Sequence, residues 1–410
     1  MTKTDWKKCK LGDVCYPVSE TYNFSNREKV VFINTGDISF GKFLKKEYEP
    51  VVSLPGQAKK SIQKNDILFS EIRPANGRFA LVDFDAQDFV VSTKLMVLRS
   101  RQIIDLKFLY LLLTNKYTLA EFQHIAESRS GTFPQITFDA ISYFPISLPP
   151  LEEQTRIAEV LGAFDDKIEL LQKQNKTLED MAKALFKSWF VDFDVVRAKQ
   201  KGLPKADIMR EYHLTDELYD LFPSSFADSP LGPIPSGWEV KPLKDLTSIT
   251  AGKRPKQVKD IKDDNFFIPV YGGNGIKWWT NVSLYSTPII ITGRVGTLGK
   301  VYRIHEPVWV SDNALIFEVK KELFEYLLYM LQTIDFNSFN RGSTQPLITQ
   351  SDIKEILAVF DQNIVQTFHS IVVEYEKKIN NNNRQIQTLT ELRDSLLPRL
   401  ISGKIRVLIH

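Results

Sequence analysis

Several glycine- and proline-rich turns in this 410-residue chain carry arginine, lysine and asparagine side chains. One of them is the turn Arg73-Pro-Ala-Asn-Gly-Arg78. Arginine can donate two hydrogen bonds to a guanine edge, and asparagine can pair in the same two-point manner with adenine. Hydroxyl groups and lysines in neighbouring turns suit phosphate oxygens. We therefore predict nucleic-acid contacts at Arg73, Asn76, Arg78, Lys94, Arg129, Ser130, Thr132, Lys253, Arg254, Lys256, Asn274, Lys277, Arg294, Thr297, Lys300, Arg341, Ser343 and Thr344.

Each of these turns, taken singly, is also explained as a solvated surface loop. Recurrence favours a binding role, because basic turns of related composition occur in both halves of the chain. Arg294-Val-Gly-Thr-Leu-Gly-Lys300 is the expected counterpart of the turn at 73–78, and Asn340-Arg-Gly-Ser-Thr344 that of Ser128-Arg-Ser-Gly-Thr132. Which of them contact bases rather than phosphates depends on loop geometry and on DNA shape.

No motif for catalysis or metal binding accompanies these turns. The chain has no Gly-x-Gly-x-x-Gly after a strand and no phosphate-binding loop that ends in Gly-Lys-Ser/Thr. Its five histidines are scattered, and its two cysteines, Cys9 and Cys15, have no further cysteine to complete a metal site. Asp66 and Glu71 are spaced faintly like nuclease carboxylates, but no lysine completes the set. We expect a non-catalytic chain with no metal or cofactor of its own.

The composition is that of an ordinary globular protein. Charged residues make up 25% and hydrophobic residues 43%, and the formal net charge is only +3. A protein that coats DNA non-specifically carries far more positive charge, so any DNA affinity must come from local basic patches. Residues 1–10 are polar and precede no apolar signal segment, and the apolar runs are too short to span a bilayer. We expect a cytoplasmic protein with no membrane contact.

The second part of the chain repeats the first. An ordered series of short matches relates the two parts, and chance does not produce such a series. We therefore interpret the chain as a duplication. The matching segments are Trp6 to Asp13 with Trp238 to Asp245, Phe32-Ile33 with Phe267-Ile268, Arg73 with Arg294, Val91-Ser92 with Val310-Ser311, Phe108 to Leu113 with Tyr326 to Leu331, and Arg129 to Thr137 with Arg341 to Thr349.

Each copy ends in a heptad pattern of apolar residues, which predicts a long amphipathic helix. Pro149-Pro150 end the first globular part, and Glu152 and Glu153 suit the first turn of the helix that follows. The expected coiled-coil interface positions are Ile157, Leu161, Phe164, Ile168, Leu171, Asn175, Leu178, Leu185, Val372, Tyr375, Ile379, Asn382, Ile386, Leu389 and Leu396.

One antiparallel pairing of the two helices puts Asn175 opposite Asn382. A buried asparagine without a partner costs about 1–3 kcal/mol, so two asparagines that meet would fix the register and orientation of the pair. The alternative is that each helix packs elsewhere and both asparagines face water. Trp189, Phe190 and Phe193 form an apolar stripe near the end of the first helix, which fits either the core or a docking face for a partner.

The expected fold class is α+β, with two tandem α/β recognition domains separated by two long antiparallel coiled-coil helices in a pseudo-twofold internal repeat. The first domain is expected over 1–148 and its helix over 149–199. A linker rich in proline, serine and glycine is expected within 200–236. The second domain follows over 237–357, and the second helix with a C-terminal tail over 358–410.

Three segments are similar to hallmark sequences of the specificity subunits of type I restriction-modification systems. They are Pro149-Pro-Leu-Glu-Glu-Gln-Thr-Arg-Ile-Ala-Glu-Val-Leu161, Gly232-Pro-Ile-Pro-Ser-Gly-Trp-Glu-Val240 and Ser395-Leu-Leu-Pro-Arg-Leu-Ile-Ser-Gly-Lys-Ile-Arg-Val407. The resemblance covers essentially the whole chain as target-recognition domain, helix, target-recognition domain, helix. The second copy departs from it at Asp361 to Phe368, where both prolines of the first helix entry are missing.

The resemblance implies a double-stranded DNA site in two specific halves separated by a non-specific spacer, with one domain reading each half. The helices would set the spacer, since the stretch from Ile157 to Trp189 spans roughly 50 Å at 1.5 Å per residue. They would also dock two methyltransferase subunits, which bind S-adenosylmethionine and flip the target adenine. Restriction subunits that use ATP and magnesium to translocate DNA can join that core. The chain itself would hold no cofactor.

Two other classes of protein remain open. A coiled-coil scaffold that binds only proteins predicts no salt-dependent affinity for duplex DNA. An autonomous DNA-modifying enzyme predicts transfer of a labelled methyl group from S-adenosylmethionine to DNA by the pure chain.

Overall fold

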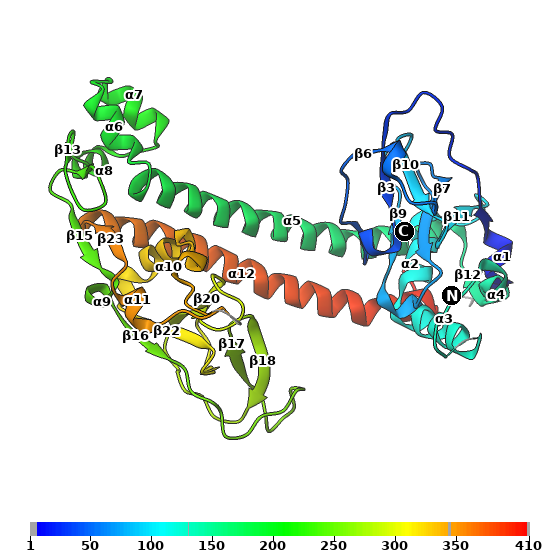
Figure 1. The fold of residues 1–410 in the computed structure, drawn as a ribbon. Coiled ribbons are helices and arrows are strands. Elements are labelled where there is room, and N and C mark those ends of the chain that lie inside the picture. Colours follow the sequence, from blue (N-terminus) through cyan, green and yellow to red (C-terminus); the bar gives the residue numbers. More distant parts are fainter. Residues whose placement is uncertain (1–5, 130, 343–345, 408–410) are drawn as a thin grey trace. The chain divides into compact units, whose positions relative to one another are not determined.

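The computed structural model describes residues 6–129, 131–342 and 346–407, and it falls into two compact units (Figure 1). The first unit comprises Met1–Leu171 together with Arg384–His410, and the second comprises Gln172–Asn383. Both units mix helices with short strands that are mostly antiparallel. The class is therefore mixed α and β, as the sequence predicts. In the described ranges no helix is long and apolar enough to cross a membrane.

Two four-stranded sheets build the first unit. One is antiparallel, in the order β2 (Cys15–Val18), β11 (Leu95–Ser100), β8 (Ile67–Ser70), β9 (Phe79–Leu81). The other has the order β6 (Glu49–Pro50), β3 (Lys29–Ile33), β10 (Phe89–Ser92), β7 (Ala58–Ser61), and its β3 and β10 run parallel. Two short pairs accompany them: β1 (Lys7–Lys10) with β12 (Pro145–Leu148), and β4 (Ile38–Ser39) with β5 (Lys42–Phe43). The central strands β3, β8, β10 and β11 are short, mostly apolar runs, which is typical of buried strands.

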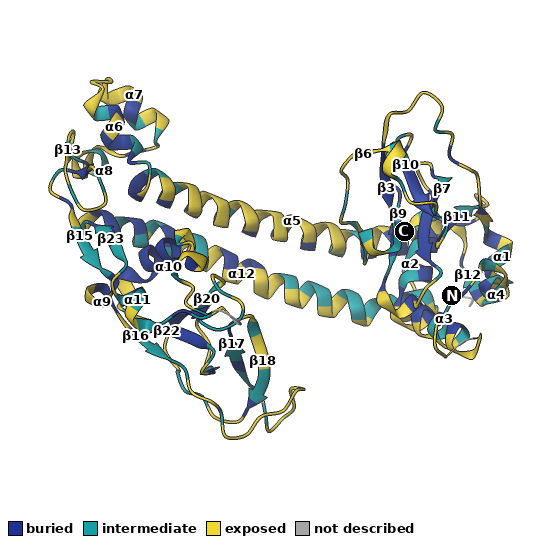
Figure 2. Cartoon of the chain, viewed as in Figure 1, coloured by how far each residue is buried: buried dark blue, intermediate teal, exposed yellow. Residues whose placement is uncertain are grey.

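The helices of the first unit begin and end at polar side chains. Asp105 caps α2 (Leu106–Thr114) by accepting a hydrogen bond from the Phe108 N–H at 2.9 Å. Buried Asn115 separates α2 from α3 (Lys116–Arg129), because its side chain accepts from the Thr118 N–H at 2.9 Å. Figure 2 shows the buried faces that these helices and the sheets share. The remaining elements are α1 (Leu11–Val14), α4 (Phe138–Ile141), η1 (Thr35–Asp37), η2 (Val51–Ser53) and η3 (Pro74–Asn76).

The second unit has the same plan. Its antiparallel sheet has the order β16 (Thr247–Ala251), β22 (Ala314–Val319), β19 (Ile289–Gly293), β20 (Val301–Ile304). A three-stranded sheet has the order β18 (Gly275–Thr280), β17 (Ile268–Gly272), β21 (Trp309–Val310), with β17 and β21 parallel. Strand β15 (Glu239–Pro242) pairs with β23 (Leu357–Phe360). The helices are α9 (Leu243–Leu246), α10 (Phe324–Thr333), α11 (Gln350–Lys354), η4 (Lys321–Leu323) and η5 (Phe336–Phe339).

The corresponding strand orders agree with a duplication but correct two of the sequence matches. The parallel pairs align Ile33 with Tyr271, not with Ile268, because Val91 and Val310 hold equivalent places beside them. Arg73 aligns with Gly296 rather than Arg294. The Arg73 N–H donates to the Pro134 carbonyl at 3.0 Å, as the Gly296 N–H donates to the Pro346 carbonyl at 2.9 Å. Short apolar pairs and single arginines recur too often to fix a register, which strand hydrogen bonds set.

Both long helices predicted from the heptads are present, as α5 (Leu151–Phe190) and α12 (Gln362–Ile401). They begin differently. The buried Gln154 side chain donates to the Pro149 carbonyl at 2.8 Å at the start of α5. At the start of α12, where the prolines are missing, the Asp361 carboxylate accepts from the Ile364 N–H at 2.9 Å. An aspartate cap thus replaces the proline entry.

Within each unit the two long helices run antiparallel. In the first unit Arg393 of α12 donates to Asp165 of α5 at 2.6 Å. In the second unit the predicted contact between Asn175 and Asn382 is present, with the Asn382 amide donating to the Asn175 oxygen at 2.8 Å. The Asn175 amide in turn donates to Asn383 at 2.8 Å. All fifteen predicted interface positions named above are buried or half-buried.

The segment 200–236, expected as a linker, is folded against the end of α5. It holds α7 (Lys205–Glu211), α8 (Asp216–Leu221) and the strand pair β13 (Phe226–Ala227) with β14 (Ile234–Pro235), and α6 (Asp194–Gln200) precedes them. The Trp189 ring lies 5.3 Å from that of Phe222, and Phe190 lies 5.9 Å from Trp238. The apolar stripe at Trp189, Phe190 and Phe193 is therefore part of the core of the second unit and not a docking face.

Candidate nucleic-acid interface

In the first unit the turn at 73–78 is held between a strand end and a helix. It leaves β8 and forms η3, with Arg73 in a left-handed conformation at φ 45°. The Arg73 N–H donates to the Pro134 carbonyl, and the Ala75 N–H donates to the Gln123 side chain of α3 at 3.1 Å. Arg73 and Asn76 are exposed. The backbone of this turn is thus fixed while two predicted base-reading side chains face solvent.

Arg78 has a different place from the one the sequence suggested. Its guanidinium donates to the Ile38 carbonyl at 2.8 Å and to the Gly36 carbonyl at 3.3 Å. Ile38 is the first residue of β4, and Gly36 lies just before the β4–β5 hairpin. Arg78 therefore positions this hairpin against the turn, and one of its nitrogens is already occupied by backbone acceptors.

The remaining predicted contacts of the first unit lie around the same strand end. The Lys94 carbonyl accepts from the Glu71 N–H at 3.0 Å, just before Arg73, and the Lys94 side chain is exposed. Arg129 ends α3 and is exposed, as is Thr132, and the chain then returns to Arg73 through Pro134. The predicted contact at Ser130 lies outside the described residues. Several cationic and polar side chains thus gather beside one end of the antiparallel sheet.

In the second unit three glycines bring the predicted segments together. A Cβ on Gly293 would lie 2.1 Å from the Thr297 carbonyl, and one on Gly252 would lie 2.2 Å from the Ser311 carbonyl. The Cα of Gly293 lies 3.1 Å from the position of a Cβ on Gly273. Only residues without a side chain permit this approach of backbone segments. The β17–β18 turn is therefore packed on the end of β19.

This packing joins residues predicted from separate turns. The Lys300 ammonium donates to the Asn274 oxygen at 2.6 Å. Arg294 has a buried Nε with no hydrogen-bond partner in the described parts of the chain, although the residue itself is only half-buried. A buried N–H group without an acceptor lowers the stability of the fold, so a bound hydrogen-bond acceptor would be favourable here. Asn274, Thr297 and Lys300 are exposed beside it.

The basic segment 253–256 and the β18 strand add exposed cations. Lys253, Arg254 and Lys256 are all exposed, and the Lys253 carbonyl accepts from the Trp309 indole at 2.6 Å. The Lys277 ammonium lies 4.1 Å from the centre of the Trp278 ring. The Lys253 backbone is tied to β21 and Lys277 lies within β18, so the sheet positions both of these cations.

Arg341 has a structural partner. Its guanidinium forms an ion pair with Asp352 of α11, with Nε 2.8 Å from the carboxylate. Hydrogen bonding by Thr349 and by Arg341 lowers the pKa of Asp352, so the pair stays charged. The presumed counterpart Arg129 ends an exposed helix turn instead, so the two loops differ. The predicted contacts at Ser343 and Thr344 lie outside the described residues.

A buried ionic cluster fixes β20, the strand that follows Lys300. Arg303 of β20 contacts Glu325 of α10 at 2.5 Å and also pairs with Glu376 of α12. Burial is the main cause that raises the pKa of Glu325 to about 7, and the charge of Glu376 adds to it. One arginine thus holds two carboxylates, and it ties the sheet edge that carries Lys300 to the long helix.

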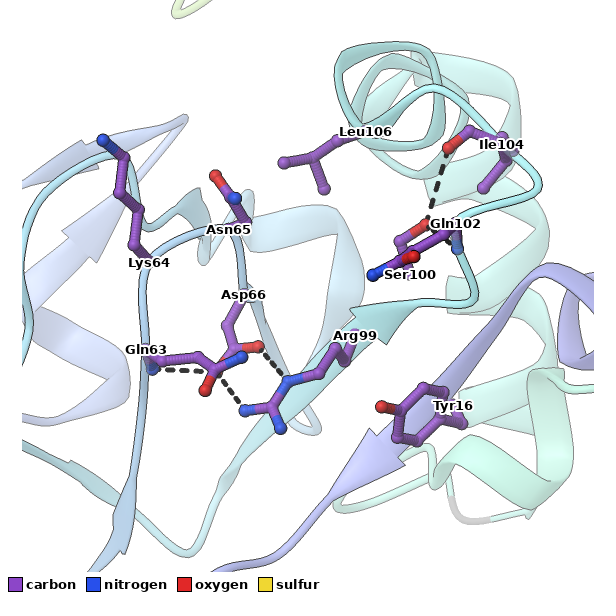
Figure 3. Close-up of a pocket in the computed structure, with 10 residues that line it drawn as sticks. All are labelled: Tyr16, Gln63, Lys64, Asn65, Asp66, Arg99, Ser100, Gln102, Ile104 and Leu106. Atoms are coloured by element: carbon purple, nitrogen blue, oxygen red, sulfur yellow. Dashed lines mark hydrogen bonds and ion pairs between the residues drawn. The ribbon is translucent and has the colours of Figure 1, made fainter. Parts of the chain in front are cut away.

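The carboxylates and the thiol that the sequence offered as candidates for chemistry have structural surroundings instead. A polar cavity of about 290 Å³ lies beside Asp66 and Arg99 (Figure 3). There the fully buried Asp66 accepts from the Arg99 guanidinium at 2.8 and 3.0 Å. Glu71, at the other end of β8, accepts from Gln135 at 2.9 Å, so the two carboxylates do not share a site. The described residues contain no cluster of three potential metal ligands. Burial raises the pKa of Cys15 to about 12, so that thiol stays protonated.

One exposed residue beside the 73–78 turn was not predicted from the sequence. Phe40, at the tip of the β4–β5 hairpin, is 65% exposed and has φ 43°. The only signal in the sequence was the glycine that follows it in Ser39-Phe-Gly-Lys42. Neither its exposure nor its place beside the 73–78 turn could be read from that signal.

Comparison with known proteins places this arrangement in a family. The profile of the type I restriction modification DNA specificity domain matches residues 3–180 and 235–382. The type I restriction enzyme HindI specificity subunit of Haemophilus influenzae is 35% identical, over 98% of this chain and 100% of that protein. The MjaIX specificity subunit of Methanocaldococcus jannaschii is 30% identical over 73% of this chain and 69% of its own length.

A solved structure has the same fold. The S subunit of a type I restriction-modification system from M. genitalium aligns with a TM-score of 0.60 at 16% identity, over 98% of this chain and 97% of that one. Two matched blocks of the family profile fall one in each half of the chain, where the two units carry the same strand order. This chain belongs to the family of type I restriction-modification DNA specificity subunits, which recognise DNA and are not catalytic.

Proposed function

We propose that this chain reads a bipartite DNA sequence, one half with each unit. The observation that carries the proposal is the repeated strand order in which the same sheet end, after β8 and after β19, bears exposed cations and amides. In the first unit these are Arg73, Asn76 and Lys94. In the second they are Asn274, Thr297 and Lys300, beside Arg294, whose Nε has no hydrogen-bond partner among the residues that the structure describes. Such groups suit base edges and phosphates.

The long helices would act as an antiparallel coiled coil that sets the spacer between the half-sites. The asparagine contacts at 175, 382 and 383 support this role, because a polar layer in an apolar seam selects one register. The two units would be related by a pseudo-twofold repeat, with the target-recognition domains over 1–148 and 237–357.

The partners would supply the chemistry. Two methyltransferase subunits that bind S-adenosylmethionine would dock on the helices, and restriction subunits that use ATP and magnesium would join them in the cytoplasm. The chain's own residues would then only bind and orient DNA. This division predicts that the pure chain transfers no methyl group from labelled S-adenosylmethionine to DNA.

An exchange of domains tests the bipartite reading. Residues 1–148 are replaced by the first domain of a relative with a different target, and methylated adenines are mapped in host DNA for both chains. We expect one half of the methylated sequence to change and the other half to stay. A change in both halves would contradict the division of labour between the units.

Salt dependence distinguishes this function from a protein-binding scaffold. Binding of the chain with its methyltransferase to the mapped duplex should weaken steeply between low and moderate salt, since phosphate contacts release counterions. The Arg73→Ala variant should lose affinity for the mapped duplex more than for a duplex with a scrambled first half-site. A scaffold would show no duplex affinity at any salt concentration.

A further inference from the structure

The β4–β5 hairpin turns through two residues in unusual conformations. Phe40 has φ 43° and Gly41 has φ 85°, and the flanking Ser39 and Lys42 pair across the hairpin. Two central residues with positive φ are typical of the type I′ turn, which favours Asn-Gly. A bulky aromatic residue in the left-handed region is an outlier. Turn chemistry therefore does not explain a phenylalanine at position 40.

Burial does not explain it either. The Phe40 side chain is 65% exposed, although its ring forms a T-shaped pair with the buried Phe79 ring at a centroid distance of 5.9 Å. A phenylalanine that folding alone required would be expected inside, where its large apolar surface is removed from water. Strained residues of this kind cluster at binding sites, where surrounding contacts hold them.

The surrounding contacts here are specific. The Phe40 N–H donates to the Gly77 carbonyl at 2.7 Å, and the Gly41 N–H donates to the Phe79 carbonyl at 2.9 Å. A Cβ on Gly77 would lie 2.4 Å from the Phe40 ring, so the ring occupies the space that a side chain would need. Arg78 holds the first strand of the hairpin through the Ile38 carbonyl. The ring is thus fixed on the turn that carries Arg73 and Asn76.

The hairpin tip also has a charge that suits DNA. Lys42 is exposed and follows Phe40 by two residues, and Asn76 is exposed next to Gly77. Apolar side chains that enter the minor groove beside basic and amide groups wedge between base pairs and kink the duplex. An exposed, rigidly held ring flanked by a lysine has the composition of such a wedge.

We propose that Phe40 inserts between two neighbouring base pairs of the DNA bound by the first unit, while Lys42 contacts an adjacent phosphate. The inference rests on the proposed DNA-reading function and adds to it a residue that distorts the duplex. It also explains why Arg78 is used to hold the hairpin instead of reading a base.

Three variants test the wedge in the full chain with its methyltransferase. Phe40→Asn supplies the residue that the turn prefers, so the melting temperature should stay the same or rise. Affinity for a duplex carrying the mapped site should fall about tenfold, within the roughly 5- to 150-fold that stacking on one base contributes. Phe40→Leu keeps an apolar wedge and should retain most of the affinity. Tyr117→Asn is the matched control, because Tyr117 is also 65% exposed and lies on α3.

A fluorescence measurement tests directly whether base stacking is disrupted. Duplexes with 2-aminopurine at successive positions of the first half-site should show a fluorescence rise at one step when the wild-type complex binds. Phe40→Asn should abolish that rise, whereas Tyr117→Asn should keep it. Unchanged affinity and fluorescence for Phe40→Asn would overturn the wedge and leave DNA reading intact. If the wild-type complex binds no duplex with sequence preference, both proposals fail. A fall in melting temperature for Phe40→Asn would show that the ring serves folding.

Discussion

At the scale of single residues, the two units solve the same backbone problem with different side chains. Arg73, in the turn after β8, and its counterpart Gly296, in the turn after β19, both have a left-handed backbone, with φ 45° and φ 78°. Glycine adopts this conformation without steric cost, whereas other residues lose about 1–2 kcal/mol. Folding alone would therefore favour glycine at position 73. An arginine there is expected if its side chain serves binding.

This difference gives a paired prediction. Arg73→Gly should raise the free energy of unfolding by about 0.5–1 kcal/mol, because strain is relieved, and should weaken DNA binding. Gly296→Ala should lower it by about 1 kcal/mol. Urea denaturation measures both changes, and fluorescence anisotropy with the mapped duplex measures binding. Equal stabilities for Arg73→Gly and the wild type, with undiminished binding, would show that the side chain is incidental.

The buried cluster around Arg303 predicts a pH dependence. The folded state raises the pKa of Glu325 from its ordinary 4.5 to about 7, chiefly through burial. Between these values the folded chain keeps a proton that the unfolded chain has released, so stability falls as the pH rises. The full shift corresponds to roughly 3 kcal/mol. Burial also raises the pKa of Glu376, which acts in the same direction.

Glu325→Gln should therefore flatten the decline in stability between about pH 4.5 and 7. The measurement is urea denaturation of the full chain at several pH values. Glu322→Gln is the control, because Glu322 is exposed on the neighbouring η4 and should leave the slope unchanged. An equal slope for Glu325→Gln and the wild type would mean that the cluster is not protonated in this range.

The DNA contacts predicted from the sequence stay predictions, and the structure shows only where these side chains lie. Arginine, lysine and asparagine in glycine-rich turns do gather at equivalent sheet ends. The sequence could not reveal that Arg78 binds backbone carbonyls or that Arg341 pairs with Asp352, because such partners are distant along the chain. Phe40 was missed because its exposure depends on how the hairpin packs.

At the scale of elements, the heptads gave reliable helices and one specific contact. Asn382 is fully buried and donates to Asn175, while its own oxygen lacks a partner among the described residues. A polar layer of this kind lowers stability relative to an apolar layer but excludes other registers. The two long helices were predictable because the heptad period is local to each of them.

A double-mutant cycle tests this layer. Asn382→Ala leaves the Asn175 oxygen without its donor and should cost about 1–3 kcal/mol. The double variant with Asn175→Ala should cost less than the two single changes together, since the pair is coupled. Thermal or urea unfolding measures each step. Asn381→Ala, at an exposed neighbour, should stay within about 0.5 kcal/mol of the wild type. Strict additivity would argue that the hydrogen bond contributes nothing.

Other elements were less predictable. The segment 200–236 is rich in proline, serine and glycine, yet it forms α7, α8 and a strand pair on an aromatic cluster. Composition predicts turns well, but it cannot show that Phe222 and Ile234 find an apolar surface to bury. The misaligned repeat matches have a similar cause, since strand pairing rather than residue identity fixes register.

At the scale of the whole molecule, the helices predict how the recognised sequence responds to length. One heptad inserted in α5 after Leu171 and one in α12 after Asn383, at the boundaries of the two units, would lengthen both helices by about 10 Å. We expect the spacer between the half-sites to grow by about three base pairs and the half-sites to stay unchanged. Mapping of methylated adenines in host DNA measures both. A single heptad in α5 alone is the control, because the two helices then no longer match in length and folding should be impaired.

The first unit is discontinuous along the chain, and this affects how it folds during synthesis on the ribosome. Leu400 is buried in the same core as Phe108, and Arg406 pairs with Glu153 at the start of α5. The second unit is one uninterrupted stretch, Gln172–Asn383, and can mature as soon as it has left the ribosome. The first unit is begun earlier but must wait for residues 384–407. During that wait its unfinished core is exposed to chaperones and to aggregation, so the half that is synthesised first is the half completed last.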